Sequence, residues 1–353
     1  MSPLKRICLK LKDKNLDALL VSNSANIRYL TDYEARESYL LVSLKKSFFV
    51  TDFRYFYEAK KRVPDFSIKL IDGSLFKLIA KLAKELKISR LGFEAKDLIY
   101  AEQQKIREEL DKKIDFVATY DFVEELRETK GLKEIKKIKM ATRMAISAMH
   151  FAKKIVRPGL REIDLAFEIE RFIRIEKKAG ISFPLIVASG PNSSFPHHIT
   201  SKRKLLKNDI VLIDLGVDFQ GYKSDLTRVF FLGRIPSYVR KIYSIVLAAQ
   251  NAAIREVRAG IPIKNIDKKA RQLIIQKGYG RYFGHALGHG IGLEVHEAPH
   301  ISEKNKERLK AGMVFTIEPA IYLPARFGIR IEDMVRVGEN GCEVLSGGLD
   351  KSG

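Results

Sequence analysis

The sequence predicts an α/β domain followed by an α+β domain with an antiparallel sheet. Up to about residue 126, short apolar runs alternate with helical patterns, which is typical of an α/β domain. Beyond that point, helices and paired strands are grouped apart, which is typical of an α+β domain. A chain of 353 residues also favours two domains. We therefore assign residues 1–126 to the first domain and residues 127–353 to the second.

The first domain is expected to contain six strands and three helices. Apolar and β-branched runs predict strands at 16–22, 39–44, 47–52, 66–72, 90–94 and 114–119. Apolar residues at helical spacing predict helices at 53–62, 75–87 and 101–113. From residue 121 to residue 156 the pattern is continuously helical, so the domain boundary, near Glu125–Lys130, falls within a predicted helix.

The second domain is expected to combine long helices with two strand pairs. Helical patterns cover 132–156, 163–179, 237–258 and 265–277, and Pro158-Gly159 and Gly260-Ile261-Pro262 act as stops. One strand pair is DIVLIDLGVDF with YKSDLTRVFFLG, and the other is MVFTIEPAIYL with GIRIEDMVRV. Strands grouped in this way predict an antiparallel sheet.

Composition and charge argue against several classes of protein. Two cysteines cannot form a disulfide framework, the amino terminus has no apolar signal segment, and no run approaches the ~18 apolar residues of a membrane-spanning helix. We therefore expect a cytoplasmic protein with no membrane partner. The net charge of +21 is spread along the chain and interleaved with acids, as in KLAKELK. This pattern indicates a solvated surface, so we do not expect a nucleic-acid partner.

Four of the seven histidines fall within GHALGHGIGLEVHEAPH, residues 284–300, whose last five letters match the H-E-x-x-H pattern of zinc proteases. That pattern requires a helix, on which the two histidines share one face. Here Pro299 and four glycines oppose a helix, and LEVH alternates apolar and polar residues as a strand does. We therefore reject the helical zinc motif.

The first strand pair presents two acids from apolar strands. Asp214 lies in VLIDLG and Asp225 in SDLTRVFF, and a hairpin turning around Phe219–Gln220 would place them opposite each other. Opposed side chains on paired strands have Cβ atoms about 4.5–5.5 Å apart, and like charges there are destabilising. Two buried carboxylates in this position therefore require a cation.

The second strand pair repeats this arrangement. A hairpin turning around Ala325 would bring Glu318 opposite Glu332. Two divalent cations would neutralise the four carboxylates, and neutral His289 would complete a set of five ligands. A hydroxide between the two metal ions would be the nucleophile. Oxygen-rich ligation with one imidazole favours manganese or cobalt, although affinity does not exclude zinc.

These motifs, in this order, resemble the M24 metallopeptidase family, whose pita-bread fold is shared by prolidase, aminopeptidase P and methionine aminopeptidase. The resemblance covers nearly the whole chain and rests on IDLG, GYKSDLTR, GHGIGLEVHE, TIEP, RIED and, at residues 188–198, ASGPNSSFPHH. Residues 1–124, with NIRYLTDYEARESYLLVS and VTDFRYFYEA, resemble the amino-terminal domain of prolidase and aminopeptidase P. Methionine aminopeptidases generally lack that domain, which argues against them.

The resemblance implies hydrolysis of the peptide bond before proline. The implied metal ligands are Asp214 for one ion, His289 and Glu318 for the other, and Asp225 and Glu332 as bridges. Glu318 would also handle the proton, and His296 would stabilise the oxyanion or the departing nitrogen. His197 and His285 would line the substrate pocket. Arg330, two residues before Glu332 on the same side of a strand, could anchor a bridging carboxylate or a substrate carboxylate.

Other residues near these motifs are expected to have supporting roles. The histidines expected to be structural are His150, His198 and His300, and the acids expected to support the ligands or to lie in solvent are Glu297 and Asp333. The sequence Gly288-x-Gly290-x-Gly292 lacks the spacing of a dinucleotide fingerprint. We expect these glycines to let the backbone pass close to the metal ions.

Several functions remain open within this interpretation. Prolidase activity on Xaa-Pro dipeptides competes with aminopeptidase P activity on longer peptides, and the short chain favours the dipeptidase. A loop at Asp32–Ser38, with Arg36 as a carboxylate clamp and contributed by the partner subunit of a homodimer, would exclude longer peptides. A catalytically silent relative that binds nucleic acid or protein, or a metal-independent hydrolase such as creatinase, is disfavoured because all five ligand positions are filled.

Overall fold

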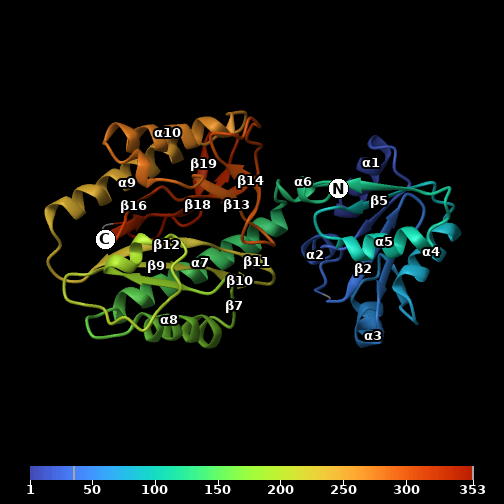
Figure 1. Ribbon diagram of the computed structural model, residues 1–353, viewed down its shortest axis with the longest axis horizontal. Coiled ribbons are helices and arrows are strands. Elements are labelled where there is room, and N and C mark those ends of the chain that lie inside the picture. The colour runs from blue at the N-terminus through green and yellow to red at the C-terminus, as the bar shows by residue number, and fades with distance from the viewer. Residues whose placement is uncertain (35, 352–353) are drawn as a thin grey trace. The chain divides into compact units, whose positions relative to one another are not determined.

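A computed structural model describes residues 1–34 and 36–351 of the chain (Figure 1). The chain forms two units, the first running from Met1 to Arg127 and the second beginning at Glu128. Among the described helices, none combines the length and the apolar character that crossing a membrane requires.

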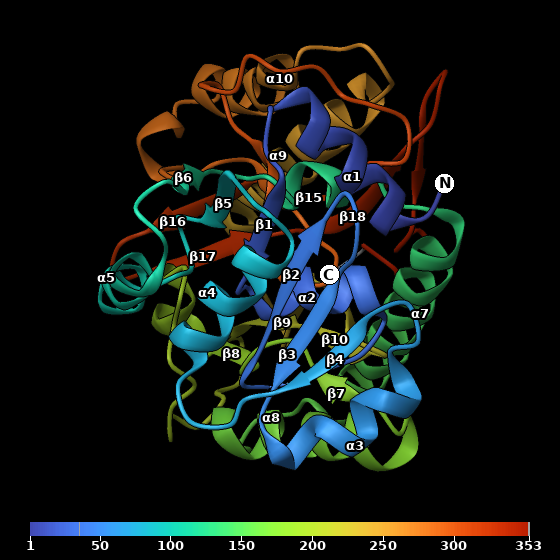
Figure 2. The ribbon, with the colours of Figure 1, turned by 90° about the vertical axis from the view of Figure 1, so that its right-hand side faces the viewer.

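The first unit is built around a mixed sheet (Figure 2). Its strands are β1 (Ala18–Val21), β2 (Ser38–Ser43), β3 (Phe48–Thr51), β4 (Ser67–Leu70), β5 (Arg90–Glu94) and β6 (Asp115–Thr119). Its helices are α1 (Pro3–Asp13), α2 (Ser24–Thr31), α3 (Phe53–Arg62), α4 (Leu75–Glu85), α5 (Tyr100–Glu109) and α6 (Glu124–Arg127). The order in the sheet is β4-β3-β2-β1-β5-β6, with β2 antiparallel to both neighbours and the other pairs parallel.

The six strands and three helices predicted for this unit are confirmed. Both faces of the sheet are buried: Leu20 and Leu41 pack with α4 and α5, whereas the alternating Leu19 and Leu40 lie on the face of α1 and α2. The sequence analysis missed α1 and α2. Only Ile7 and Leu11 of the 11 residues of α1 are buried, so its apolar stripe is short, and α2 has only 8 residues.

The continuous helix predicted from residue 121 to residue 156 is wrong. α6 ends at Arg127, and α7 (Leu132–Ile155) begins only after an extended segment. In that segment Thr129 forms a β-bridge with Met313, and the Lys130 amide donates to the carbonyl of Gly312 at 3.0 Å. Pairing with a distant part of the chain therefore overrides the local helical pattern.

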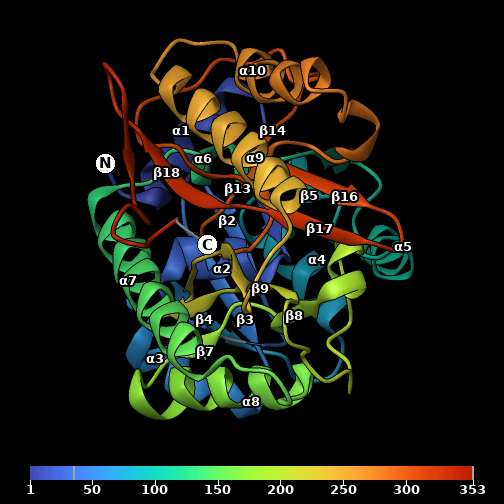
Figure 3. The same cartoon turned by 90° about the vertical axis from the view of Figure 1, so that its left-hand side faces the viewer.

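The second unit places its strands between two groups of helices. After α7 the helices are α8 (Glu162–Arg171), α9 (Ser237–Glu256) and α10 (Ile263–Gln276). The strands are β7 (Gly180–Ile181), β8 (Ile186–Ser189), β9 (Ile210–Leu215), β10 (Val217–Phe219), β11 (Tyr222–Lys223), β12 (Leu226–Phe231), β13 (Gly288–Gly290), β14 (Glu297–Ile301), β15 (Val314–Ile317), β16 (Ala320–Leu323), β17 (Phe327–Arg330), β18 (Asp333–Val337) and β19 (Cys342–Val344). In Figure 3, α9 and α10 lie on one side of the strands and α7 and α8 on the other.

All the strand pairs in this unit are antiparallel, as predicted, in the orders β12-β9-β8, β14-β13-β15-β18-β19, β11-β10-β7 and β16-β17. One buried apolar core joins α9 and α10 to the strands that carry the predicted acids, and includes Val246, Ile266 and Phe315. The four predicted helices are found, although the predicted 163–179 helix leaves α-helical geometry at Phe172 for a short π-helical turn.

The first strand pair has a register different from the predicted one. The turn lies at Gln220-Gly221, where both residues have positive φ, 52° and 85°. Such a pair suits the two-residue type I′ hairpin turn. Asp214 consequently pairs with Thr227, and Asp225 lies diagonally across from it. Moving the turn centre by one residue shifts the pairing by two, so both acids still face the same side.

The second strand pair has the predicted register. β16 and β17 turn around Ala325, and β15 and β18 continue the same alignment. Glu318 and Glu332 lie level with each other in the gap between these two ladders. On the first of the two strands the gap consists of Glu318 and Pro319, and the nitrogen of Pro319 cannot donate a ladder hydrogen bond.

Candidate metal centre

The predicted ligands and histidines line one cavity of about 640 Å³ in the second unit. The ligand residues on its wall are Asp214, Asp225, His289, Glu318 and Glu332, and the other histidines are His197, His285, His296 and His300. Arg330 and Tyr322 complete the polar side, and Phe183, Pro184 and Ile186 form an apolar wall. The five predicted ligands, which span more than a hundred positions of sequence, are thus brought to one place.

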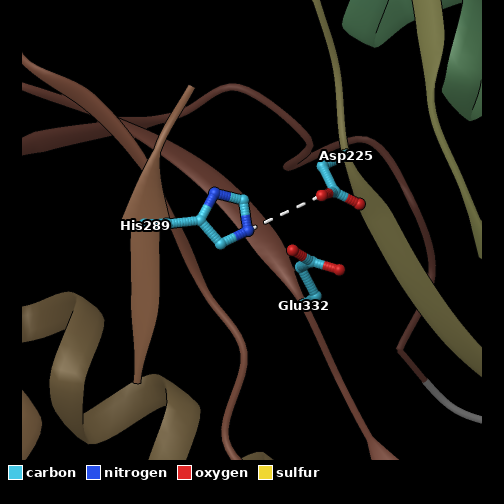
Figure 4. A group of neighbouring side chains, drawn as sticks. All are labelled: Asp225, His289 and Glu332. Carbon is cyan, nitrogen blue, oxygen red and sulfur yellow. Dashed lines mark ion pairs between the residues drawn. The ribbon is translucent and has the colours of Figure 1, made fainter. Parts of the chain in front are cut away.

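Three of these ligands converge on one point, as Figure 4 shows. Asp225, His289 and Glu332 each offer a ligand atom, and these atoms lie within 4.8 Å of one another. Nε2 of His289 lies 3.7 Å from Oδ2 of Asp225 and 3.3 Å from Oε1 of Glu318. The imidazole therefore points into the group of carboxylates.

The His289 ring is oriented by its own backbone. Nδ1 lies 3.1 Å from the carbonyl of Gly290, which can only accept, so Nδ1 carries a proton. Nε2 therefore faces the acids, where it binds a cation through its lone pair or, when protonated, donates to a carboxylate. Thr316 supports the same geometry, because its hydroxyl accepts from the His289 amide at 3.1 Å and donates to Glu318 at 3.2 Å. Histidines that bind metals commonly show this arrangement.

Arg330 holds the remaining predicted ligand, Asp214. Nη2 donates to Oδ2 of Asp214 at 2.6 Å, and Nη1 donates to the Tyr322 hydroxyl at 2.7 Å and to the Pro196 carbonyl at 3.2 Å. Nε donates to the Thr227 hydroxyl at 3.0 Å. Four of the five guanidinium N–H groups are thus used within the protein. Arg330 thus anchors Asp214 and neither of the acids assigned as bridges, which corrects the first of its two predicted partners. The other predicted partner, a substrate carboxylate, stays a prediction.

Thr227 is a site residue that the sequence analysis missed. Its hydroxyl donates to Oε2 of Glu332 at 2.7 Å and accepts from Arg330, so it joins one ligand to the residue that orients another. The signal in the sequence is its position two residues after Asp225, which places both side chains on the same side of a strand.

Both acids expected to support the ligands are buried. Asp333 accepts from Arg228 at 2.7 Å, and the same guanidinium donates to the carbonyl of Glu332 at 2.6 Å. Glu297 pairs with Lys130 at 2.7 Å, with side chains only 5% and 1% exposed. The alternative that these acids lie in solvent is therefore wrong, because each has a buried cationic partner.

The acids carry more negative charge than the protein neutralises. Burial raises the pKa of Asp225 and of Glu332 well above the usual range, and the neighbouring carboxylates add to the effect. Oδ1 of Asp214, Oδ1 of Asp225 and Oε1 of Glu332 are buried and have no hydrogen-bond partner among the described residues. Buried carboxylate oxygens are normally paired or bound to metal. The donor set thus fits divalent cations held by oxygens and one imidazole.

His285 presents an uncommitted nitrogen to this cavity. Nδ1 lies 2.8 Å from the Ala286 carbonyl and must donate to it, which leaves a lone pair on Nε2. Nε2 is buried without a partner in the described part of the chain. Burial lowers the pKa of His285, so the neutral ring is favoured. Arg271, itself paired with the buried Asp267, donates to the His285 carbonyl at 2.8 Å and fixes the segment.

His296 and His300 line the cavity, whereas His198 and His150 lie outside its lining. The His296 ring lies 4.3 Å from the His289 ring, and burial followed by the proximity of His289 lowers the pKa of His296. His300 was expected to be structural, but it pairs with His289 across β13 and β14 and lines the cavity. Because directly opposed residues on paired strands share a sheet face, His300 lies on the same face as His289. His198 has a structural contact, with Nε2 3.0 Å from Glu162.

The HEAPH segment is not helical, in agreement with the rejection of the zinc motif. Residues Glu297–Ile301 form β14. The strand predicted at LEVH is wrong, because residues 292–296 form a bend in which the Gly292 amide donates to the Glu294 carbonyl at 3.0 Å.

The glycines around His289 serve close packing of the backbone. A Cβ on Gly288 would lie 2.0 Å from the carbonyl oxygen of Thr316, and one on Gly290 would lie 2.1 Å from that of Ala298. The predicted reason, passage close to the metal ions, stays a prediction. Neighbouring strands, which leave no room for a side chain at these positions, impose glycine.

Replacing Gly290 with alanine is expected to destabilise the second unit. The new Cβ meets backbone that cannot move aside, and such overpacking costs about 1–3 kcal/mol. Urea unfolding of the purified variant measures this change. Gly284→Ala is the matched control, since its Cβ would meet no atom within 4 Å, and should change the free energy of unfolding by less than about 0.5 kcal/mol. Equal losses in both variants would contradict the packing explanation.

Known protein families match both units of the chain. The description "Metallopeptidase family M24" matches residues 136–339, and "Creatinase/Prolidase N-terminal domain" matches residues 3–129. The first match alone covers more than half of the chain. The chain belongs to metallopeptidase family M24. It is therefore a metallopeptidase, and its family implies divalent metal ions.

Members of family M24 align with this chain over nearly its full length. The Xaa-Pro dipeptidase of Pyrococcus horikoshii is 34% identical over 342 residues, covering 96% of this chain and 95% of the relative. The solved Xaa-Pro dipeptidase from Bacillus anthracis is 37% identical with a TM-score of 0.94, covering 98% of this chain and 96% of that one. The solved X-Pro aminopeptidase from Thermotoga maritima is 35% identical with a TM-score of 0.90, covering 98% of both chains. These similarities confirm the predicted pita-bread fold behind a prolidase-like amino-terminal domain.

Proposed function

We propose that the protein is an Xaa-Pro dipeptidase that hydrolyses the peptide bond before proline with two divalent metal ions. One observation carries this proposal: three buried carboxylate oxygens that have no hydrogen-bond partner among the described residues belong to residues that line a single cavity in a member of family M24. The residues proposed to hold the ions are Asp214, Asp225, His289, Glu318 and Glu332. Manganese or cobalt suits this oxygen-rich set better than zinc.

The metal ions, when bound, polarise the scissile carbonyl and lower the pKa of a water molecule. Hydrolysis then gives the carbonyl carbon a hydroxyl group and the proline nitrogen a proton. Glu318 is proposed to hold that proton, since its side chain is 16% exposed while His289 and Thr316 contact its Oε1. Burial alone would raise the pKa of Glu318, but the hydrogen bond and charge of His289 outweigh it and lower the pKa. The ionised carboxylate can therefore accept a proton and pass it on.

The remaining cavity residues are proposed to bind the peptide. His296, beside His289, would stabilise the oxyanion or the departing nitrogen. His285 would use Nε2 to accept a hydrogen bond from the substrate, and His197 would line the same cavity. Arg330 would act mainly through Asp214, because most of its donors are already used. The apolar wall that includes Phe183 suits the carbon ring of proline.

Hydrolysis assays on metal-stripped protein test this function. We expect no cleavage after chelation, and recovery on addition of Mn²⁺ or Co²⁺, with Xaa-Pro dipeptides cleaved faster than Xaa-Pro-Yaa tripeptides. Xaa-Ala dipeptides are the control for proline specificity. Faster cleavage of the tripeptides would instead favour an aminopeptidase P activity, the second name found among the relatives. Two bound metal ions per chain with no cleavage of any proline peptide would contradict the proposed substrate.

Preference for dipeptides is proposed to depend on the segment Asp32–Ser38 of the partner in a homodimer, with Arg36 as the clamp. Residue 35 in that segment lies outside the described residues, so this clamp stays a prediction. The Arg36→Ala variant should gain activity on tripeptides relative to dipeptides if the clamp exists. A cytoplasmic location and the lack of a nucleic-acid partner likewise stay predictions from the sequence.

A further inference from the structure

Glu162, the first residue of α8, is a fully buried carboxylate that accepts hydrogen bonds from six groups. The donors are the amide and hydroxyl of Ser189 at 2.7 Å each, the amide and hydroxyl of Ser201 at 3.1 and 2.6 Å, the side-chain amide of Asn192 at 3.0 Å, and the His198 ring at 3.0 Å. The side chain of Glu162 is 0% exposed. So many donors on one carboxylate indicate a role beyond capping the helix, since its partners belong to a single distant segment.

The partners of Glu162 span residues 189–201, the segment that carries His197. This segment runs through a short 3-10 helix, Gly190–Ser194, and then through irregular backbone, so it has no sheet ladder to hold it after β8. Burial would raise the pKa of Glu162, but the hydrogen bonds from Ser189, Ser201 and His198 outweigh it and lower the pKa to about 2. The anchor therefore stays ionised at any pH at which the protein works, and charge-assisted hydrogen bonds are the strong kind.

The residues immediately before and after His197 in the chain are both held by polar contacts. On one side, the Pro196 carbonyl accepts from Arg330, the residue that also holds the metal ligand Asp214. On the other side, His198 contacts Glu162. His197 itself is exposed and lines the cavity. The two residues that flank His197 in the chain are thus held by Arg330 on one side and by Glu162 on the other, while Ser193 and Thr200 contact other strands further along the segment.

We propose that Glu162 is a positioning residue for the reaction, which acts by holding His197 over the metal centre through the segment 189–201. This inference rests on the proposed function, because it takes His197 to contact the substrate. A purely structural role for Glu162 is the alternative, in which its loss weakens the whole second unit and His197 has no special part. The two roles predict different energetic coupling between Glu162 and His197.

A double-mutant cycle between Glu162→Gln and His197→Ala separates these roles. If Glu162 acts through His197, we expect Glu162→Gln to lower kcat/KM on an Xaa-Pro dipeptide by about ten- to hundredfold, the effect of a small misplacement. In the His197→Ala background the same change should then lower it by less than about twofold, as for residues that act as a unit. Metal content should remain that of the wild type. An equal loss in both backgrounds would overturn the proposal.

Glu168→Gln provides the matched control on the same helix. Glu168 pairs with Arg171 at the surface, with its side chain 49% exposed, and the substitution makes the same change of charge. We expect kcat/KM of this variant to equal that of the wild type. A loss like that of Glu162→Gln would show that α8 tolerates no such change anywhere and would overturn a specific role of Glu162.

Hydrogen exchange of the metal-loaded protein tests the anchoring without any substrate. Glu162→Gln should speed exchange in peptides covering 186–203 and leave β15 and β18 unchanged. Unchanged exchange in 186–203 would overturn the inference even if the enzyme is a dipeptidase. If no proline peptide is cleaved, the proposed function fails, and only faster exchange in that segment would still support the anchoring of His197.

A second pair of variants covers the case in which Glu162→Gln does not fold. His198→Gln keeps a donor in reach of Glu162, whereas His198→Phe keeps the ring and loses the donor. We expect His198→Gln to retain a higher kcat/KM than His198→Phe, and the difference should vanish in the His197→Ala background. The reverse order, or a difference that persists without His197, would contradict the proposal.

Discussion

Asp225→Asn is expected to abolish metal-dependent hydrolysis while stabilising the metal-free protein. Asp225 lies beside His289 and Glu332, and its buried Oδ1 has no hydrogen-bond partner within residues 1–34 and 36–351. An amide cannot supply the negative charge that a divalent ion requires, so the activity should fall by on the order of 10³-fold or more, as when one member of a catalytic unit is removed. The metal-free protein should gain, because burial and neighbouring carboxylates raise the pKa of Asp225 and ionised Asp225 therefore opposes folding.

The two effects are measured on the same preparation. Calorimetry of the chelated variant should show a melting temperature higher by roughly 2–4 °C, the shift that about 1 kcal/mol produces in a domain of this size. Added Mn²⁺ should raise the melting temperature of the wild type further, since ligands that bind only the folded state stabilise it, but should leave the variant unchanged. A variant that loses stability without metal would contradict the charge argument, and one that retains activity would remove Asp225 from the centre.

Asp218→Asn is the control on the same hairpin. Asp218 accepts from the Gly221 amide at 2.8 Å, a hydrogen bond that the asparagine oxygen can keep, and its ion pair with Lys223 lies away from the cavity. We expect unchanged activity and a change in unfolding free energy within about 0.5 kcal/mol, as for surface substitutions. A difference in activity and stability between the Asp225 and Asp218 variants would then result from the position of the residue, because both variants carry the same change from aspartate to asparagine.

The ligand set could be predicted from the sequence because its residues stand in strands with strong local signals. Asp214 interrupts an otherwise apolar strand, and the turn around Ala325 fixes the alignment of Glu318 with Glu332. Alternation with period two then assigns all these acids to one side even where the turn is misplaced by a residue, as happened between Asp214 and Asp225. Errors of register thus left the candidate site intact.

The features that the sequence did not predict depend on contacts between distant segments. The helix predicted through residue 130 is broken by a β-bridge from Thr129 to Met313, which is almost two hundred positions away in the chain. His300 was expected to be a structural residue, because nothing in the HEAPH sequence shows that it pairs with His289. The side-chain contacts of Arg330 and Glu162 are of the same kind, since both residues bind segments whose approach only the folded chain determines. Local patterns carry no information on such contacts.

Arg330→Met is expected to destabilise the metal-free protein by about 3–5 kcal/mol, the usual result of removing one partner of a buried ion pair. Arg330 is 4% exposed and donates to Asp214, which is itself buried. Without the guanidinium, the carboxylate of Asp214 loses its hydrogen-bonded cation while it still faces Glu318. The Tyr322 hydroxyl and the Pro196 carbonyl also lose their donor, so the segment before His197 should loosen as well.

A second substitution decides whether the charge or the packing of Arg330 matters. If the loss comes from the uncompensated carboxylate, adding Asp214→Asn to Arg330→Met should recover a large part of it, because the coupling between paired residues is typically 0.5–3 kcal/mol. Arg336→Met on β18 is the control, with a side chain 34% exposed and a loose contact of 3.6 Å to Glu343, and should change stability by less than about 0.5 kcal/mol. Urea unfolding in chelator measures the wild type, the Arg330→Met and Asp214→Asn single variants, the double variant and the Arg336→Met control. Additive losses at Arg330 and Asp214 would mean that the guanidinium stabilises the fold through its packing and its other hydrogen bonds, and that Asp214 keeps its position without it.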